Sequence, residues 1–158
     1  MQWMMLGAAM TAMSTGAAAA ADYVVIPLST TVNRPADVVW AKVSGDCDIG
    51  AWLKIPCVIT AGQAGSVGAV RRIADRIDEV FVARTARSYT YTQPKSPIDY
   101  HGTVEARDAG GGRTTLTYTL IYDQEPMKTP EARLAEKTSR TERFTAILAT
   151  MKTIAEAP

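Results

Sequence analysis

The chain has 158 residues, of which 47% are hydrophobic, and a formal net charge of +1. A nearly neutral chain without a basic stripe argues against a dedicated nucleic-acid binder. The length suits one domain with one core. The sequence contains no repeat array, coiled coil or low-complexity tail, and no pattern in it specifies an oligomeric state.

Residues 1–21 are predicted to be a secretory signal peptide. An apolar run is followed by small residues and by Ala19-Ala20-Ala21 before Asp22, which fits an A-x-A cleavage site, although no Lys or Arg precedes Arg34. A disordered leader and a membrane anchor are the alternatives, and the polar residues at 11, 14 and 15 make an anchor the poorer one. We expect a periplasmic or secreted domain of residues 22–158, with no membrane span after cleavage.

The start of this domain predicts one strand and two short helices. Residues 22–32 are rich in β-branched side chains, which favour a strand. Pro35 suits the first turn of a helix that ends near residues 44–45. A second helix over 48–53 presents Trp52, and Pro56 ends it.

The next part of the chain predicts three more strands, over residues 57–61, 69–76 and 77–85. The glycine-rich residues 62–68 separate the first two of them. This segment is not expected to bind phosphate, because it lacks a following Gly-Lys-Ser/Thr and leads into a strand instead of a helix.

Three alternating segments, 87–93, 98–107 and 113–123, predict consecutive antiparallel strands. Prolines break the first connection, and Asp108-Ala109-Gly110-Gly111-Gly112 supplies a turn in the second. One face of the last strand is apolar and aromatic, because period-two alternation places on it Leu116, Tyr118, Leu120 and Tyr122.

Residues 130–155 predict a long amphipathic helix that covers the concave face of the sheet. Thr129 can act as the N-cap, and Pro130 suits the first helical position. Apolar residues recur at helical spacing, namely Leu134, Phe144, Ile147, Leu148, Met151 and Ile154.

The two cysteines, Cys47 and Cys57, are expected to form a disulfide if the protein is exported. The alternative is a pair of buried free thiols. A metal site is not expected, because the single histidine, His101, is distant in sequence and no other ligand cluster surrounds the pair.

The order of these elements and a set of short motifs resemble the START-like (SRPBCC) superfamily, and its polyketide cyclase/dehydrase-like branch in particular. The matching segments are Arg34-Pro35-Ala36-Asp37-Val38-Val39-Trp40, Gly65-Ser66-Val67-Gly68-Ala69-Val70-Arg71, Tyr89-Thr90-Tyr91 with Pro97-Ile98-Asp99-Tyr100, and Thr117-Tyr118-Thr119-Leu120-Ile121-Tyr122. Tyr118 and Tyr122 stand where family members commonly have Trp and Phe.

The resemblance implies an α+β helix-grip fold, in which a curved seven-stranded antiparallel sheet wraps around the long C-terminal helix, with two short helices after the first strand. It also implies a cavity between sheet and helix for a hydrophobic or amphipathic small molecule. Members of the superfamily include lipid carriers, hormone receptors and aromatic cyclases, so the fold alone does not decide function.

Such a pocket is mostly apolar, with a few polar groups that orient the ligand. Tyrosines suit that role, and the alternative for each of them is simple core filling. The candidate ligand-binding residues are Tyr91, Tyr100, Tyr118 and Tyr122, with Trp52, Phe81, Phe144 and Leu148 as apolar lining.

Arg71 and Arg72 are neighbours on a predicted strand, so one of them can face inward, where it would need a carboxylate or an anionic ligand. The rarity of buried arginine favours the alternative that both lie on the surface. We retain Arg72 as a candidate ligand-binding residue. Alternation also places Tyr100 and His101 on opposite faces, and we expect the tyrosine inside, which disfavours a histidine-based hydrolase.

The sequence therefore predicts a carrier or binder of a hydrophobic small molecule or lipid, without cofactor or metal. The first alternative is a cyclase/dehydrase-type enzyme, in which cavity tyrosines with Arg72 or Glu79 orient a polyketide-like substrate and no catalytic residue is assigned. The second is a structural or interaction module with a filled core.

Overall fold

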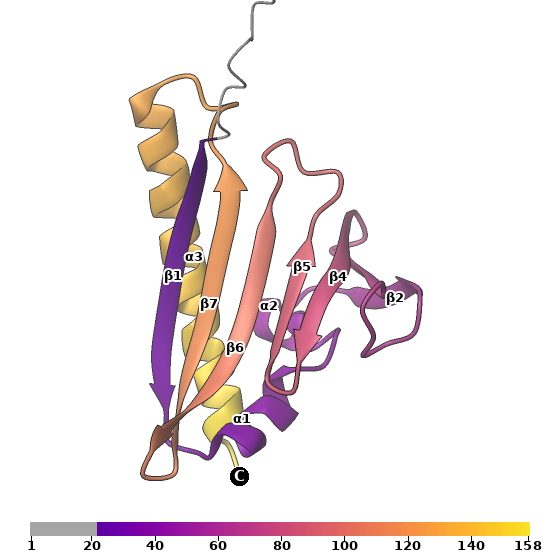
Figure 1. The fold of residues 1–158 in the computed structure, drawn as a ribbon, viewed down its shortest axis with the longest axis vertical. Coiled ribbons are helices and arrows are strands. Elements are labelled where there is room, and N and C mark those ends of the chain that lie inside the picture. Colours follow the sequence, from indigo (N-terminus) through magenta and orange to yellow (C-terminus); the bar gives the residue numbers. More distant parts are fainter. Residues whose placement is uncertain (1–21) are drawn as a thin grey trace, which may run out of the picture.

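The computed structural model describes residues 22–158, and the predicted signal peptide lies outside them. A curved antiparallel sheet carries all three helices on one side (Figure 1). The elements in chain order are β1 (Tyr23–Val32), α1 (Ala36–Val43), α2 (Ile49–Leu53), β2 (Cys57–Ala61), β3 (Val70–Ile73), β4 (Ile77–Thr85), β5 (Ser88–Thr92), β6 (His101–Gly110), β7 (Arg113–Asp123) and α3 (Pro130–Glu156).

The seven strands follow the order β1-β7-β6-β5-β4-β3-β2, and each neighbouring pair is antiparallel. Strands β2 to β7 are joined as sequential hairpins. The first strand then pairs with the last along its whole length, from Tyr23 opposite Asp123 to Val32 opposite Thr114. This arrangement confirms the predicted helix-grip fold.

Period-two alternation places the core on the face that carries the helices. In β7 the buried positions are Leu116, Tyr118, Leu120 and Tyr122, as the sequence predicts, together with Thr114. The predicted strand over 69–76 is shorter in the structure, because residues 74–76 form a tight turn in which Ala74 and Asp75 have φ values of 49° and 58°.

Helix α3 begins as predicted, since the Thr129 hydroxyl oxygen accepts a hydrogen bond from the Ala132 amide at 3.1 Å. The helix packs chiefly against β1 and α1. Its buried residues all lie in the second half, where they are Ile147, Leu148, Met151 and Ala155. Leu134 was expected on this apolar face but is 67% exposed, because the first half of the helix does not pack into the core.

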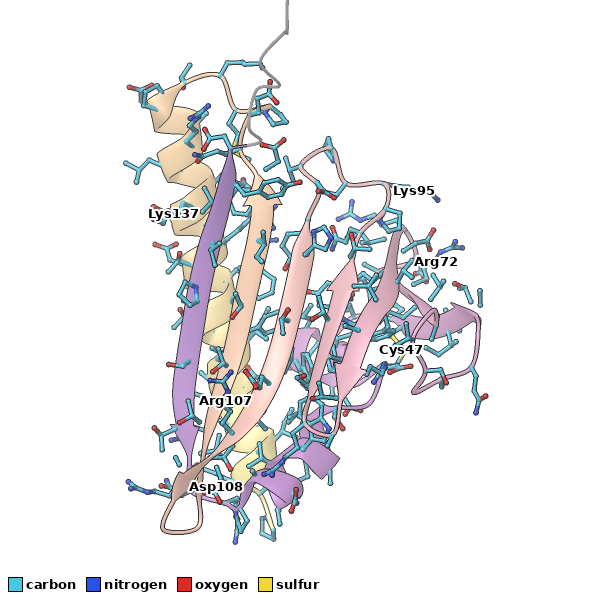
Figure 2. The ribbon with its side chains drawn as sticks, viewed as in Figure 1. Cys47, Arg72, Lys95, Arg107, Asp108 and Lys137 are labelled. Carbon is cyan, nitrogen blue, oxygen red and sulfur yellow. A yellow bond between two sulfur atoms is a disulfide. The ribbon has the colours of Figure 1, made fainter. Side chains whose placement is uncertain are left out.

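Cys47 and Cys57 form the expected disulfide, which joins the segment containing α2 to the start of β2. Figure 2 shows this bond beside β2, on the side of the molecule away from β1. Within residues 22–158, no helix has the length and apolar character needed to cross a membrane.

Candidate functional site

A cavity of about 420 Å³ lies between the inner face of the sheet, α2 and the middle of α3. From Arg140 to Ile147, helix α3 forms one wall of this cavity. The lining residues are Ile49, Trp52, Leu53, Ile55, Ile73, Ala74, Arg76, Ile77, Glu79, Tyr91, Gln93, Tyr100, Tyr118, Arg140, Arg143, Phe144 and Ile147.

Three buried tyrosines form the inner wall of the cavity. The Tyr91 hydroxyl lies 2.6 Å from the Tyr118 hydroxyl and 3.2 Å from the Tyr100 hydroxyl. The ring of Phe144 packs edge-on against Tyr118, with ring centres 4.9 Å apart, so α3 and β7 meet at this point. The three phenols come from β5, β7 and the residue before β6.

Tyr91 reaches this position because it lies across Gly102, its partner on β6. A Cβ atom at residue 102 would stand 2.5 Å from the Tyr91 ring and hydroxyl. Glycine is therefore required here to leave room for the side chain of Tyr91.

The three hydroxyls carry three protons but make only two contacts with each other. Each contact uses one proton, so one O–H remains free to donate, whichever way the bonds run. Burial raises the pKa of Tyr91 and Tyr118 well above the ordinary 10.0 and also raises that of Tyr100. The phenols are therefore protonated at neutral pH and act as hydrogen-bond groups.

Trp52 on α2 also lines the cavity and carries a further hydrogen-bond donor. The residue is 5% exposed, and its indole Nε1 is buried without a hydrogen-bond partner among residues 22–158. A buried donor of this kind favours a ligand that carries an acceptor oxygen, because an unmade hydrogen bond is costly.

Glu79 on β4 is the carboxylate of the cavity wall. Its Oε2 accepts from the Arg71 Nε at 2.7 Å, and its Oε1 accepts from the Gln93 Nε2 at 2.8 Å. Arg71 lies behind the wall, where it also donates to the Asp46 carbonyl oxygen at 2.6 Å. Both partners of the ion pair are at most 1% exposed.

The guanidinium of Arg71 stays charged in this buried place. Burial, the largest single effect, lowers the pKa of Arg71, but the Glu79 carboxylate and the smaller contributions of Tyr89, Tyr91 and Tyr118 together outweigh it, so the pKa lies above its ordinary value. The guanidinium carbon also lies 5.0 Å and 4.9 Å from the ring centres of Phe81 and Tyr91, which are favourable distances for cation–π contacts.

The structure brings most of the predicted site residues to the cavity but not all of them. Trp52, Tyr91, Tyr100, Tyr118 and Phe144 line it. Three other candidates are buried beside it: Phe81 lies against Arg71 and Arg84, Tyr122 against Arg140, and Leu148 faces β1 at a separate groove.

Arg72 lies away from the cavity. Its side chain is 42% exposed and pairs with Asp78, which also binds Lys95. Figure 2 shows Arg72 and Lys95 at the end of the sheet far from α3. The inward arginine is Arg71 instead, because it shares the inner face of β3 with Ile73, so the expectation that both arginines lie on the surface was wrong.

Tyr100 and His101 point to opposite faces, as predicted. Tyr100 is 2% exposed, whereas the His101 ring is 33% exposed and its Nδ1 lies 2.9 Å from the Asp99 carbonyl oxygen. Among the described residues, no cluster of three or more His, Cys, Asp or Glu side chains could hold a metal ion.

Sequence reasoning considered Arg71 as a possible inward residue but retained Arg72 instead, and it missed Gln93 and two arginines of the cavity lining, Arg76 and Arg143. A signal for the ion pair was present, because residues 71 and 79 are equidistant from the turn at 74–76 and so oppose each other in a hairpin. No comparable signal distinguished Arg76 from other exposed arginines.

Comparison with known proteins places the chain in a family. The profile described as "Polyketide cyclase / dehydrase and lipid transport" matches residues 24–156. The fold is that of a START-like helix-grip protein. The chain belongs to the polyketide cyclase/dehydrase and lipid transport family. A search of curated protein sequences found no significant match.

Several solved structures share the fold. A protein from Nitrosospira multiformis has a TM-score of 0.68 at 19% identity, over 82% of this chain and 94% of that one. The Zhui aromatase/cyclase from a Streptomyces species has a TM-score of 0.65 at 22% sequence identity, over 85% of this chain and 94% of that one. A norcoclaurine synthase from Thalictrum flavum has a TM-score of 0.63 at 14% sequence identity, over 87% of this chain and 97% of that one. At these identities the likeness concerns the fold.

Proposed function

We propose that this protein binds a hydrophobic or amphipathic small molecule in the cavity between its sheet and α3. The observation that carries the proposal is a space of about 420 Å³ lined by aliphatic and aromatic side chains, with hydrogen-bonding groups at its inner end and arginines toward its opening. The free O–H of the tyrosine cluster and the indole N–H of Trp52 favour a ligand with at least one acceptor oxygen.

Native mass spectrometry of the protein purified from its source cells tests this proposal. We expect a co-purifying compound with an apolar body, and we expect that compound to raise the melting temperature when added back, by mass action. A protein that is recovered empty, and whose melting temperature does not respond to a panel of hydrophobic oxygen-containing compounds, would support a filled structural module instead.

A cyclase/dehydrase-type enzyme is the second candidate, because Glu79 is an interior group able to exchange protons. Both of its oxygens already accept hydrogen bonds, from Arg71 and Gln93, which is the arrangement of a structural ion pair. We therefore favour binding without chemistry. Recovery of two bound compounds that differ by one water, with the heavier one accumulating in Glu79→Gln, would favour the enzyme.

We also propose that the protein is exported and works in the periplasm or outside the cell. The Cys47–Cys57 disulfide supports this proposal, because such bonds persist mainly in oxidising compartments. Fractionation of the source cells should recover the protein outside the cytoplasm, and its N-terminal sequence should begin at Asp22. Recovery of full-length protein from the cytoplasm would contradict export.

A further inference from the structure

The charges that line the cavity are not balanced. Three arginines, Arg76, Arg140 and Arg143, line it together with one carboxylate, Glu79. Arg140 pairs with Glu136, and the distance between the Arg140 Nη2 and the Glu136 Oε1 is 2.6 Å. Glu79 pairs with Arg71. Neither Arg76 nor Arg143 has an ion-pair or side-chain hydrogen-bond partner among residues 22–158. Two positive charges therefore remain uncompensated.

These two arginines lie where the cavity meets solvent, because both are exposed and both line it. Arg143 belongs to α3, and Arg76 ends the turn between β3 and β4. That turn is attached to the wall beside α2, since the Ala74 amide donates to the Pro56 carbonyl oxygen at 2.9 Å. The opening thus carries positive charge from two separate elements.

The inner end of the cavity has the opposite character. Glu79, Tyr91 and Tyr118 are at most 1% exposed there. An anionic group placed among them would approach the Glu79 carboxylate and would lose its hydration without gaining an unpaired cation. An anion is therefore disfavoured inside and favoured at the opening.

We propose that the ligand is an amphipathic anion, held with its carboxylate, sulfonate or phosphate group at Arg76 and Arg143 and its apolar body directed toward Tyr118 and Phe144. This inference rests on the proposed binding function and specifies the class of ligand and its orientation. Arginine suits the role because its planar guanidinium can donate two parallel hydrogen bonds to such groups.

Two fluorescent probes with the same aromatic body test the proposal. 1-Anilinonaphthalene-8-sulfonate carries an anionic group, and N-phenyl-1-naphthylamine lacks it. We expect the sulfonate to bind more tightly at low salt and to lose this advantage as salt screens the arginines. Arg76→Gln and Arg143→Gln should each weaken sulfonate binding about two- to fivefold, and the double variant about tenfold, while leaving the neutral probe unaffected.

Two further variants serve as controls. Arg113→Gln removes the same charge from the β6–β7 hairpin, away from the cavity, and should change neither dissociation constant. Arg143→Lys keeps the charge and should retain most of the sulfonate affinity. Each variant must keep the melting temperature of the wild type, because loosened proteins also bind this sulfonate.

The outcomes separate the two proposals. If the neutral probe and the sulfonate bind equally, and the cavity variants change neither, the anionic ligand is excluded while cavity binding stands. If Arg113→Gln weakens sulfonate binding as much as Arg143→Gln, the effect comes from overall charge and the inference fails. If neither probe binds the wild type, the proposed function itself fails.

Discussion

Arg71 and Glu79 face each other across β3 and β4, with 2.7 Å between the guanidinium Nε and the carboxylate Oε2 and almost no exposure of either side chain. Removing one partner leaves an uncompensated buried charge. We therefore expect Arg71→Met to lower the free energy of unfolding by about 3–5 kcal/mol, as measured by urea denaturation.

The double variant Arg71→Met/Glu79→Leu should recover much of this loss, since it removes both buried charges. Arg72→Met is the matched control. The ion pair between Arg72 and Asp78 is partly exposed, so the urea midpoint of the Arg72→Met variant should stay close to that of the wild type. An Arg71→Met variant as stable as Arg72→Met would show that the buried pair does not support the fold.

The fit of Tyr91 over Gly102 leads to a second prediction. Gly102→Ala places a methyl group 2.5 Å from the tyrosine and should lower the free energy of unfolding by about 1–3 kcal/mol through overpacking. In a Tyr91→Leu background the same substitution should have a clearly smaller effect, because the clashing ring and hydroxyl are gone. Equal effects in the two backgrounds would mean that another contact causes the loss.

The disulfide closes a loop that supplies part of the cavity wall, since Ile49, Trp52, Leu53 and Ile55 lie between Cys47 and Cys57. Breaking the bond in Cys47→Ser/Cys57→Ser should lower the free energy of unfolding by about 2–3 kcal/mol. It should also weaken binding of N-phenyl-1-naphthylamine, because the wall becomes less rigid. Thermal melts and fluorescence titrations measure the two effects.

A reducing agent should reproduce both effects in the wild type and leave the double-serine variant unchanged. If the reducing agent lowers the melting temperature of the variant as well, the loss does not come from this disulfide.

The buried tyrosines predict a loss of stability at alkaline pH. Burial raises the pKa of Tyr89 from 10.0 to about 12. Below pH 10 the phenol is protonated in both the folded and unfolded chains. Between pH 10 and 12 the unfolded chain releases the proton while the folded one keeps it, so stability falls with rising pH.

Phenolate absorbance from Tyr89 and the other buried tyrosines should therefore appear in the same cooperative step as the loss of circular dichroism. Tyr89→Phe should make the decline between pH 10 and 12 shallower, and the variant should fold at neutral pH, because the Tyr89 hydroxyl has no hydrogen-bond partner within residues 22–158. A decline as steep as that of the wild type would exclude Tyr89 as a contributor.

The strand pattern was predictable where alternation runs long. Over residues 113–123 the period of two lasts through five buried positions, so the inner face could be identified without doubt about register. Helix α3 was predictable at its start, because Thr129 and Pro130 are local signals that need no tertiary partner.

The four-residue strand β3 was harder to assign, because a turn of non-glycine residues with positive φ replaces the expected end of the strand. Within Val70–Ile73 the choice between Arg71 and Arg72 depends on the hairpin register with β4, a tertiary property. Leu134 illustrates the same limit, since helical spacing gives a direction for a side chain but not whether anything lies there to cover it.

The linked hydroxyls of Tyr100, Tyr91 and Tyr118 have one more property. Each O–H can rotate, so the whole series of bonds can reverse direction without any change in the positions of the rings. The end that donates in one state accepts in the other. Either end of the series can therefore donate to a carbonyl oxygen or accept from a hydroxyl group of the ligand, depending on the direction of the bonds.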